Sequence, residues 1–250
     1  FAGENLNYYY FGHFIGYIIL SLSKIPPIAG FFVLVAWMFG LLGMMVYRLG
    51  ADFMHALIGK ASMFAGIVSL FTVLFAGTWA IIPWAFNSAR HFLFGGDAPP
   101  FWFADPTRII PGTITEIPVY GFLVVDLHPH MWGLLNGALV LAALYCAWRS
   151  RAAFNLKNKY FWLFALLLGE TFMLNSWDAV TLGALTIAIL GYVYLKKQKI
   201  KFFLYVALLA ALAYAVALPW SLFFEAPVSG IGIVRDHSSI LQWISFWGFL

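Results

Sequence analysis

Long apolar runs dominate this sequence and restrict what it can fold into. A helix rises about 1.5 Å per residue, so roughly 20 apolar residues are needed to cross a bilayer core of about 30 Å. Six runs approach or exceed this length, and the spans they predict are 27–47, 61–84, 131–148, 160–174, 178–195 and 202–222. Apolar residues make up 63% of the chain and charged residues only 10%, a balance that excludes an ordinary water-soluble domain. The sequence therefore predicts an all-α polytopic membrane protein.

Two short basic loops, 149–159 and 196–201, give the predicted spans an orientation. Cytoplasmic loops of membrane proteins carry an excess of Lys and Arg, so we expect both loops on the cytoplasmic side. The chain between them must then cross twice, with the turn 175–178 on the far side. The same counting places 48–60 inside and both 85–130 and 223–237 outside. The net charge of +4 comes largely from these loops and therefore indicates no nucleic-acid partner.

The N-terminal segment 8–23 conflicts with this counting if it crosses the membrane. The span that begins at Pro27 must start outside, so a crossing at 8–23 would put the preceding tyrosines in the cytoplasm. The segment is also short, rich in tyrosine and followed by Lys24 and two prolines, features typical of a helix at headgroup depth. We therefore predict an interfacial or re-entrant helix on the outer face. Gly12 and Gly16 form a small-xxx-small pair, which favours close packing against another helix.

The sequence resembles a fragment at both ends. It has no initiator Met and no signal peptide, and its last apolar run, 240–250, is too short to span a bilayer. We therefore expect residues 1–250 to form a single transmembrane domain of a longer chain. The single Cys146 lies inside an apolar run, which excludes a disulfide framework and a Cys-based metal motif.

Acidic and imidazole side chains gather in a stretch that this topology places outside. Asp126, His128 and His130 lie at the start of a predicted span, and Pro129 fits the first residue of its helix. An extended backbone up to that point would put the three side chains on one side. They could bind a phosphate or a divalent metal, the metal through Asp126 and His130. The alternative is that Asp126 and His128 only cap the helix, but two imidazoles and a carboxylate exceed what a cap needs.

Two more candidates precede this cluster. Glu116 ends the stretch Thr113-Ile-Thr-Glu, which has the form of a capping box, so its role is either structural or functional. Arg108 could bind a phosphate through its forked guanidinium group, or it could pair with Asp105.

Two further pairs of candidates follow the cluster. Asn175 and Asp178 open a predicted span, and we favour a capping role because this spacing is good helix-start chemistry. Arg235 and His237 lie in an outer loop after the stretch Ser229-Gly-Ile-Gly. That loop either closes over a lipid headgroup or, as we favour, is an ordinary solvated loop.

Four motifs in a fixed order carry a family resemblance. They are Asn7-Tyr-Tyr-Tyr-Phe-Gly-His13, Glu116-Ile-Pro, Asp126-Leu-His-Pro-His130 and Asn175-Ser-Trp-Asp178. Together they resemble the archaeal and Chloroflexi YYY membrane-protein family, a domain of unknown function, over essentially the whole chain. That family in turn resembles the C-type (GT-C) membrane glycosyltransferases, which take a sugar from a polyprenyl-phosphate carrier on the outer face.

The resemblance implies a GT-C-like transmembrane helical bundle with an outer interfacial helix, and a carboxylate in the first outer loop. In the family pattern an Asp-Pro-Trp precedes Phe-Ala-Gly-Glu, whereas this sequence starts at Phe1, so Glu4 is the nearest remaining acid. The expected catalytic residues are Asp126, Glu116 and Glu4. The expected substrate- and phosphate-binding residues are Asn7, Tyr8, His13, Arg108, His128, His130, Asn175, Asp178, Arg235 and His237.

These observations lead us to expect a glycosyltransferase of the plasma membrane with its active face on the non-cytoplasmic side. Its partners would be a polyprenyl-phosphate-linked sugar and membrane lipids, and a divalent metal could assist the leaving phosphate. A secondary transporter is an alternative, although it should place ionisable residues at the midplane and often shows repeated halves. A non-catalytic subunit of a larger membrane assembly, with other membrane proteins as partners, is the third hypothesis.

Overall fold

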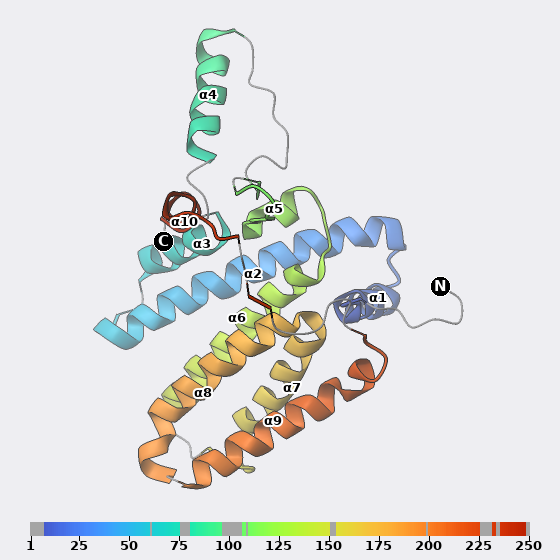
Figure 1. The fold of residues 1–250 in the computed structure, drawn as a ribbon, viewed down its shortest axis with the longest axis vertical. Coiled ribbons are helices and arrows are strands. Elements are labelled where there is room, and N and C mark those ends of the chain that lie inside the picture. Colours follow the sequence, from blue (N-terminus) through green and yellow to red (C-terminus); the bar gives the residue numbers. More distant parts are fainter. Residues whose placement is uncertain are drawn as a thin grey trace.

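The computed structural model describes residues 8–60, 62–75, 81–96, 107–108, 110–150, 154–198, 200–225, 232–233 and 236–248. Within these ranges every regular element is a helix (Figure 1). Four of the described helices are long and apolar enough to cross a membrane, namely α2 (Pro27–Ile58), α6 (Pro129–Ser150), α8 (Ser176–Gln198) and α9 (Ile200–Ser221). The chain is therefore an integral membrane protein with an all-α fold, as predicted.

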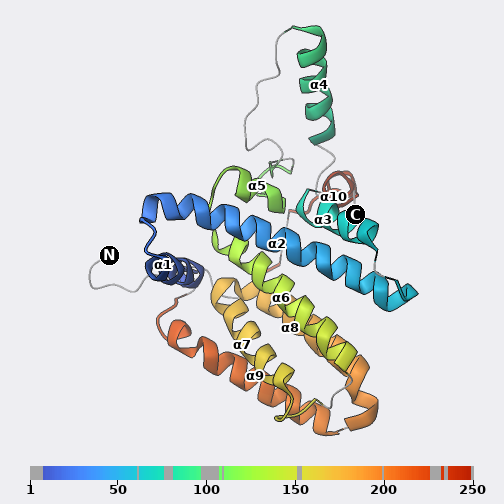
Figure 2. The same cartoon turned by 180° about the vertical axis from the view of Figure 1, so that it is seen from behind.

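Helix α7 (Lys159–Leu174) lies at the centre of the bundle that α6, α8 and α9 form around it (Figures 1 and 2). It is shorter than the four long helices, but the predicted span 160–174 matches its bounds closely. Phe161 and Phe164 on α7 are fully buried, and they belong to one apolar core with Tyr194 of α8 and Phe202 of α9. Rings of this size bury a large apolar area, so they hold the four helices together.

Helix α2 crosses this bundle over α6, and α3 (Met63–Leu74) packs along α2 (Figures 1 and 2). Met38 and Leu42 of α2 and Met131 and Leu135 of α6 form a second buried core. The remaining helices are α1 (Phe11–Ser23), α4 (Ile81–Phe94), α5 (Pro118–Leu123) and α10 (Ile240–Trp247).

Two of the predicted spans were wrong in extent. Helix α2 does not end near residue 47 but continues to Ile58, and Arg48 and Asp52 of the predicted inner loop form an ion pair of 2.8 Å one turn apart on it. The predicted span 61–84 is replaced by α3, which is about 18 Å long, and the separate helix α4. Gly77 and Thr78, both weak helix formers, lie between them in residues outside the described ranges.

The segments predicted to share one side of the membrane lie at the same end of the bundle. At one end, the Tyr9 hydroxyl hydrogen-bonds the Ser176 hydroxyl, and the Tyr9 ring stacks on Trp220. At the other end, the Tyr145 hydroxyl donates to the backbone carbonyl of Asp52 at 2.9 Å. Each of these contacts links segments that the positions of the basic loops had placed on the same side of the membrane.

Helix α1 packs against α6 through the two glycines singled out in the sequence. Gly12 and Gly16 are buried, and both face the indole of Trp132. The prediction of close packing from the small-xxx-small pair is therefore confirmed. Figure 1 shows α1 end-on while α6–α9 lie in the plane of the picture, so α1 runs crosswise to them. With 13 residues it is about 20 Å long, and both features agree with an interfacial helix.

Candidate functional site

A buried threonine fixes the loop that carries Glu116. Thr107 is fully buried, and its carbonyl accepts hydrogen bonds from the backbone N–H of Thr115 at 2.9 Å and from its hydroxyl at 3.1 Å. This holds Glu116 beside the start of α6, where its Oε2 lies 3.3 Å from Nε2 of His130. The loop that carries Glu116 therefore meets the start of α6 at one carboxylate–imidazole pair.

The capping-box interpretation of Glu116 was wrong. No helix begins at Thr113, whose hydroxyl instead donates to the carbonyl of Ile110 at 2.9 Å. The next helix, α5, begins at Pro118 with Ile117 at its N-cap, because proline has a backbone angle suited to the first helical position. The Glu116 side chain is thereby free to pair with His130.

A tight turn after α5 places Asp126 and His128. Val125 has a φ of 56°, which costs a β-branched residue roughly 1–3 kcal/mol and is typical of over-determined functional sites. The backbone N–H of His128 donates to the carbonyl of Asp126 at 2.8 Å. The predicted extended backbone was therefore wrong here, because the chain folds back on itself. Pro129 does begin α6, as expected.

The turn produces a second carboxylate–imidazole pair beside the first. Oδ1 of Asp126 lies 2.6 Å from Nδ1 of His128, and the rings of His128 and His130 are 5.6 Å apart between centroids. The Asp126–His128 pair is about half exposed, while Glu116 retains only 26% of its side-chain exposure. We call these the outer pair (Asp126, His128) and the inner pair (Glu116, His130).

Helix α1 and the residues just before it bring two more polar side chains near the outer pair. The rings of Tyr8 and His13 are 6.1 Å apart. Burial lowers the pKa of His13 and the charge of His128 lowers it further, although a hydrogen bond to the Leu127 carbonyl and the charge of Asp126 oppose this. Burial, and then the charge of Asp126, raises the pKa of Tyr8. Both groups are therefore within electrostatic reach of the outer pair.

Helix α8 contributes Asp178 from the other side of α6. A Cβ at Gly133 would lie 2.8 Å from Oδ2 of Asp178, so glycine at this position allows the carboxylate to approach the α6 backbone. Asp178 also interacts electrostatically with His130. Asn175 accepts a hydrogen bond from the backbone N–H of Trp177 at 3.1 Å, which confirms its predicted capping role.

The remaining expected site residues lie partly outside and partly inside the described ranges. Glu4, Asn7 and Arg235 lie outside the described residues. His237 is exposed in the segment before α10, and the described part of the chain gives it no hydrogen bond or ion pair. Arg108 donates from Nη1 to its neighbour Thr107, at 2.7 Å to the hydroxyl and 3.1 Å to the carbonyl, while Asp105 lies outside the described residues.

The expected metal ligands have separate partners. Asp126 pairs with His128, whereas His130 pairs with Glu116. Over the described ranges, no group of three or more His, Cys, Asp or Glu side chains could hold a metal ion. The arrangement fits acid–base chemistry better than metal coordination, because each imidazole is oriented by its own carboxylate.

Sequence reasoning missed two residues that position the site. Trp132 lies two residues after His130, and α1 packs against it. Its indole is buried against Gly12. Tyr9 ties the N-terminal segment to Ser176 at the start of α8. The run of three tyrosines was the available signal, since a buried Tyr needs a partner for its hydroxyl.

Comparison with known proteins agrees with this architecture at the level of the family. The family described as "Uncharacterized membrane protein (DUF2298)" matches residues 1–250. No curated protein and no solved structure matches the chain. The chain therefore belongs, over its whole length, to the uncharacterized membrane protein family DUF2298.

Proposed function

We propose that this protein is a membrane glycosyltransferase that moves a sugar from a polyprenyl-phosphate carrier to an acceptor hydroxyl on the non-cytoplasmic face. The observation that carries the proposal is the meeting of the outer and inner pairs at one end of the bundle. Two oriented acid–base groups side by side suit a reaction in which one group removes a proton while another assists a leaving group. The four motifs resemble the YYY family, which in turn resembles the GT-C enzymes, and this supports the same reaction class.

The outer pair is suited to the role of general base. With its Oδ1 2.6 Å from Nδ1 of His128, the Asp126 carboxylate can accept the Nδ1 hydrogen, which leaves Nε2 to take the proton of the acceptor hydroxyl. The hydroxyl oxygen then forms a bond to the anomeric carbon of the sugar. The bond from that carbon to the phosphate oxygen breaks, and its electron pair leaves with the lipid phosphate. In this scheme His128 is the base and Asp126 orients it, which refines the expectation that Asp126 itself is the base.

The inner pair is suited to stabilising the departing phosphate. With Glu116 beside Nε2 of His130, the imidazolium form of His130 can keep its Nε2 hydrogen toward the carboxylate and donate the hydrogen of its other ring nitrogen to a phosphate oxygen as negative charge develops there. The two imidazole rings are 5.6 Å apart, and the attacking and leaving oxygens are on opposite sides of the anomeric carbon. One active site can therefore serve both events.

The secondary-transporter hypothesis receives less support from the charges. The fully or nearly fully buried polar side chains inside the described bundle are uncharged, and Asn136 donates to Thr171 at 2.7 Å and to the Leu167 carbonyl at 3.0 Å. A transporter that couples substrate movement to an ion would need ionisable side chains deep in the bundle, near the bilayer midplane. The outer and inner pairs lie instead at one end of the bundle.

The test is turnover of lipid-linked sugars by the full-length protein in proteoliposomes. Wild-type protein, His128→Asn and His55→Asn are compared over a panel of polyprenyl-phosphate sugars, because His55 is an exposed histidine in the last turn of α2. We expect transfer by wild type and His55→Asn and a loss of about 10²–10⁴-fold in His128→Asn, the usual contribution of a general base. Unchanged transfer in a folded His128→Asn variant, or no transfer from any donor, would overturn the proposal.

A further inference from the structure

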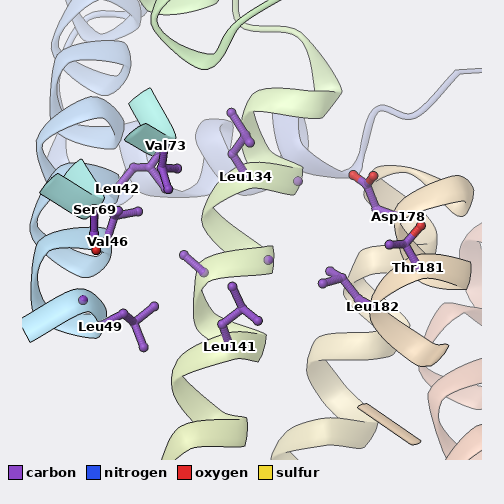
Figure 3. Close-up of a pocket in the computed structure, with 14 residues that line it drawn as sticks. Leu42, Val46, Leu49, Ser69, Val73, Leu134, Leu141, Asp178, Thr181 and Leu182 are labelled. Carbon is purple, nitrogen blue, oxygen red and sulfur yellow. The ribbon is translucent and has the colours of Figure 1, made fainter. Parts of the chain in front are cut away.

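Two apolar cavities follow one another along α6. The first, of about 400 Å³, lies among α2, α3, α6 and α8, with Leu42 and Val46 on one side and Leu182 on the other (Figure 3). The second, of about 650 Å³, is lined by Phe53 of α2, Trp148 of α6 and Tyr192 of α8.

The two cavities form one groove. Leu49 and Gly50 of α2 and Leu141 of α6 line both of them. Phe53 and Tyr192 are exposed side chains at 54% and 85%, so the groove opens sideways toward lipid between α2 and α8. A molecule within the bilayer can therefore enter it without passing through water.

The length of the groove exceeds one leaflet. Along α6 it runs from Gly133 to Trp148, which is about 22 Å at 1.5 Å per residue. One leaflet of the hydrocarbon core is about 15 Å thick. The acyl chains of ordinary bilayer lipids reach on average no further than their own leaflet, whereas a longer single chain would cross the midplane within this groove.

One end of the groove connects to the candidate site. Asp178 and Gly133 line it there, and Gly133 follows His130 of the inner pair by three residues on α6. The Thr181 hydroxyl at the same end donates to the Trp177 carbonyl at 3.2 Å. At the opposite end the Tyr145 hydroxyl donates to the Asp52 carbonyl, so the groove presents an apolar surface there. A chain in the groove would thus have its head near the inner pair and its tail among aromatic rings.

We infer that this groove binds the hydrocarbon tail of a single-chain lipid phosphate longer than one leaflet, and that its aromatic end at Trp148 and Tyr192 selects for chain length. The inference rests on the proposed function for the identity of the head group. It adds that the protein discriminates among isoprenyl phosphates by their tails, at a site separate from the acid–base pairs.

The test measures binding without requiring turnover. Full-length protein in nanodiscs is titrated with two isoprenyl monophosphates, one shorter than a leaflet and one longer, and with phosphatidic acid as the two-chain control. Leu141→Trp fills the junction of the two cavities. Leu139→Trp, also on α6 and similarly exposed at 45% against 41%, lies outside the residues that line them and is the matched control. Leu141→Ala leaves the junction open.

We expect wild type, Leu139→Trp and Leu141→Ala to bind the long isoprenyl phosphate at least about tenfold more tightly than the other two lipids. Leu141→Trp should lose this preference while its melting temperature stays near that of Leu139→Trp. Equal binding of both chain lengths by wild type, tighter binding of phosphatidic acid, or a preserved preference in Leu141→Trp would overturn the inference. Length-selective binding without sugar transfer would refute the proposed function alone.

Discussion

The contact between Gly12 and Trp132 should decide whether α1 stays in place beside the outer pair. In Gly12→Ala the new Cβ would lie 2.9 Å from Nε1 of Trp132 and closer still to Cγ and Cδ1. The indole cannot easily yield because it is rigid and only 5% exposed. Overpacking of this kind costs about 1–3 kcal/mol, against a gain of up to about 1 kcal/mol from the higher helix propensity of Ala.

Gly40→Ala is the matched control, because a Cβ there meets nothing within 4 Å. We expect it to gain about 0.5–1 kcal/mol from helix propensity alone. The two variants should thus differ by roughly 2 kcal/mol, which corresponds to about 4–8 °C in melting temperature for a chain of this size.

The assay is thermal denaturation in detergent, followed by circular dichroism, with Trp132→Leu and Gly12→Ala/Trp132→Leu as further variants. Shortening Trp132 removes the clash, so the cost of Gly12→Ala should largely disappear in that background. The reasoning is refuted if Gly12→Ala melts as high as Gly40→Ala, or if the Trp132→Leu background leaves the cost of Gly12→Ala unchanged.

Three further expectations follow from the site and the topology. Val125→Gly should be about 1 kcal/mol more stable than Val125→Ala, because both remove the side chain but only glycine tolerates the φ of 56° without strain; an equal or higher melting temperature for the Ala variant would contradict this. Burial lowers the pKa of His13, so as the pH falls the unfolded chain binds a proton at His13 before the folded chain does. The free energy of unfolding therefore drops below about pH 6.5. His13→Gln should lose less stability than wild type over that range, and identical pH profiles would argue against a buried, neutral His13. In a Cys146→Ala background, cysteines at Ser176 and Lys157 should react with an impermeant thiol reagent from opposite sides of the membrane, and labelling from one side would reject the topology.

The sequence was most informative where composition and helix-start chemistry decide the outcome. Long apolar runs between basic loops located α6, α8 and α9 within two or three residues, because a bilayer leaves a helix as the main way to satisfy the backbone. The same criterion failed at 61–84, where hydropathy alone could not detect the end of α3 at Leu74. It also missed the continuation of α2 to Ile58, since Arg48 and Asp52 neutralise each other on the helix surface.

At the candidate site the sequence predicted which residues gather better than how they pair. The sequence grouped Asp126 with His130 as possible metal ligands, and the structure pairs Asp126 with His128 after the turn at Val125. The partner of His130, Glu116, comes from a loop fixed by Thr107. No local pattern encodes that contact, because it depends on two hydrogen bonds between residues eight positions apart.

The most direct test of the central claim is whether Asp126 and His128 act as one unit in sugar transfer. Transfer rates are measured for full-length wild type, Asp126→Asn, His128→Asn and the double variant with the same polyprenyl-phosphate sugar. Groups that work together are strongly non-additive, so the double variant should be no slower than His128→Asn alone. If the losses of the two single variants instead multiply in the double variant, the two residues act independently and the proposed base pair is wrong.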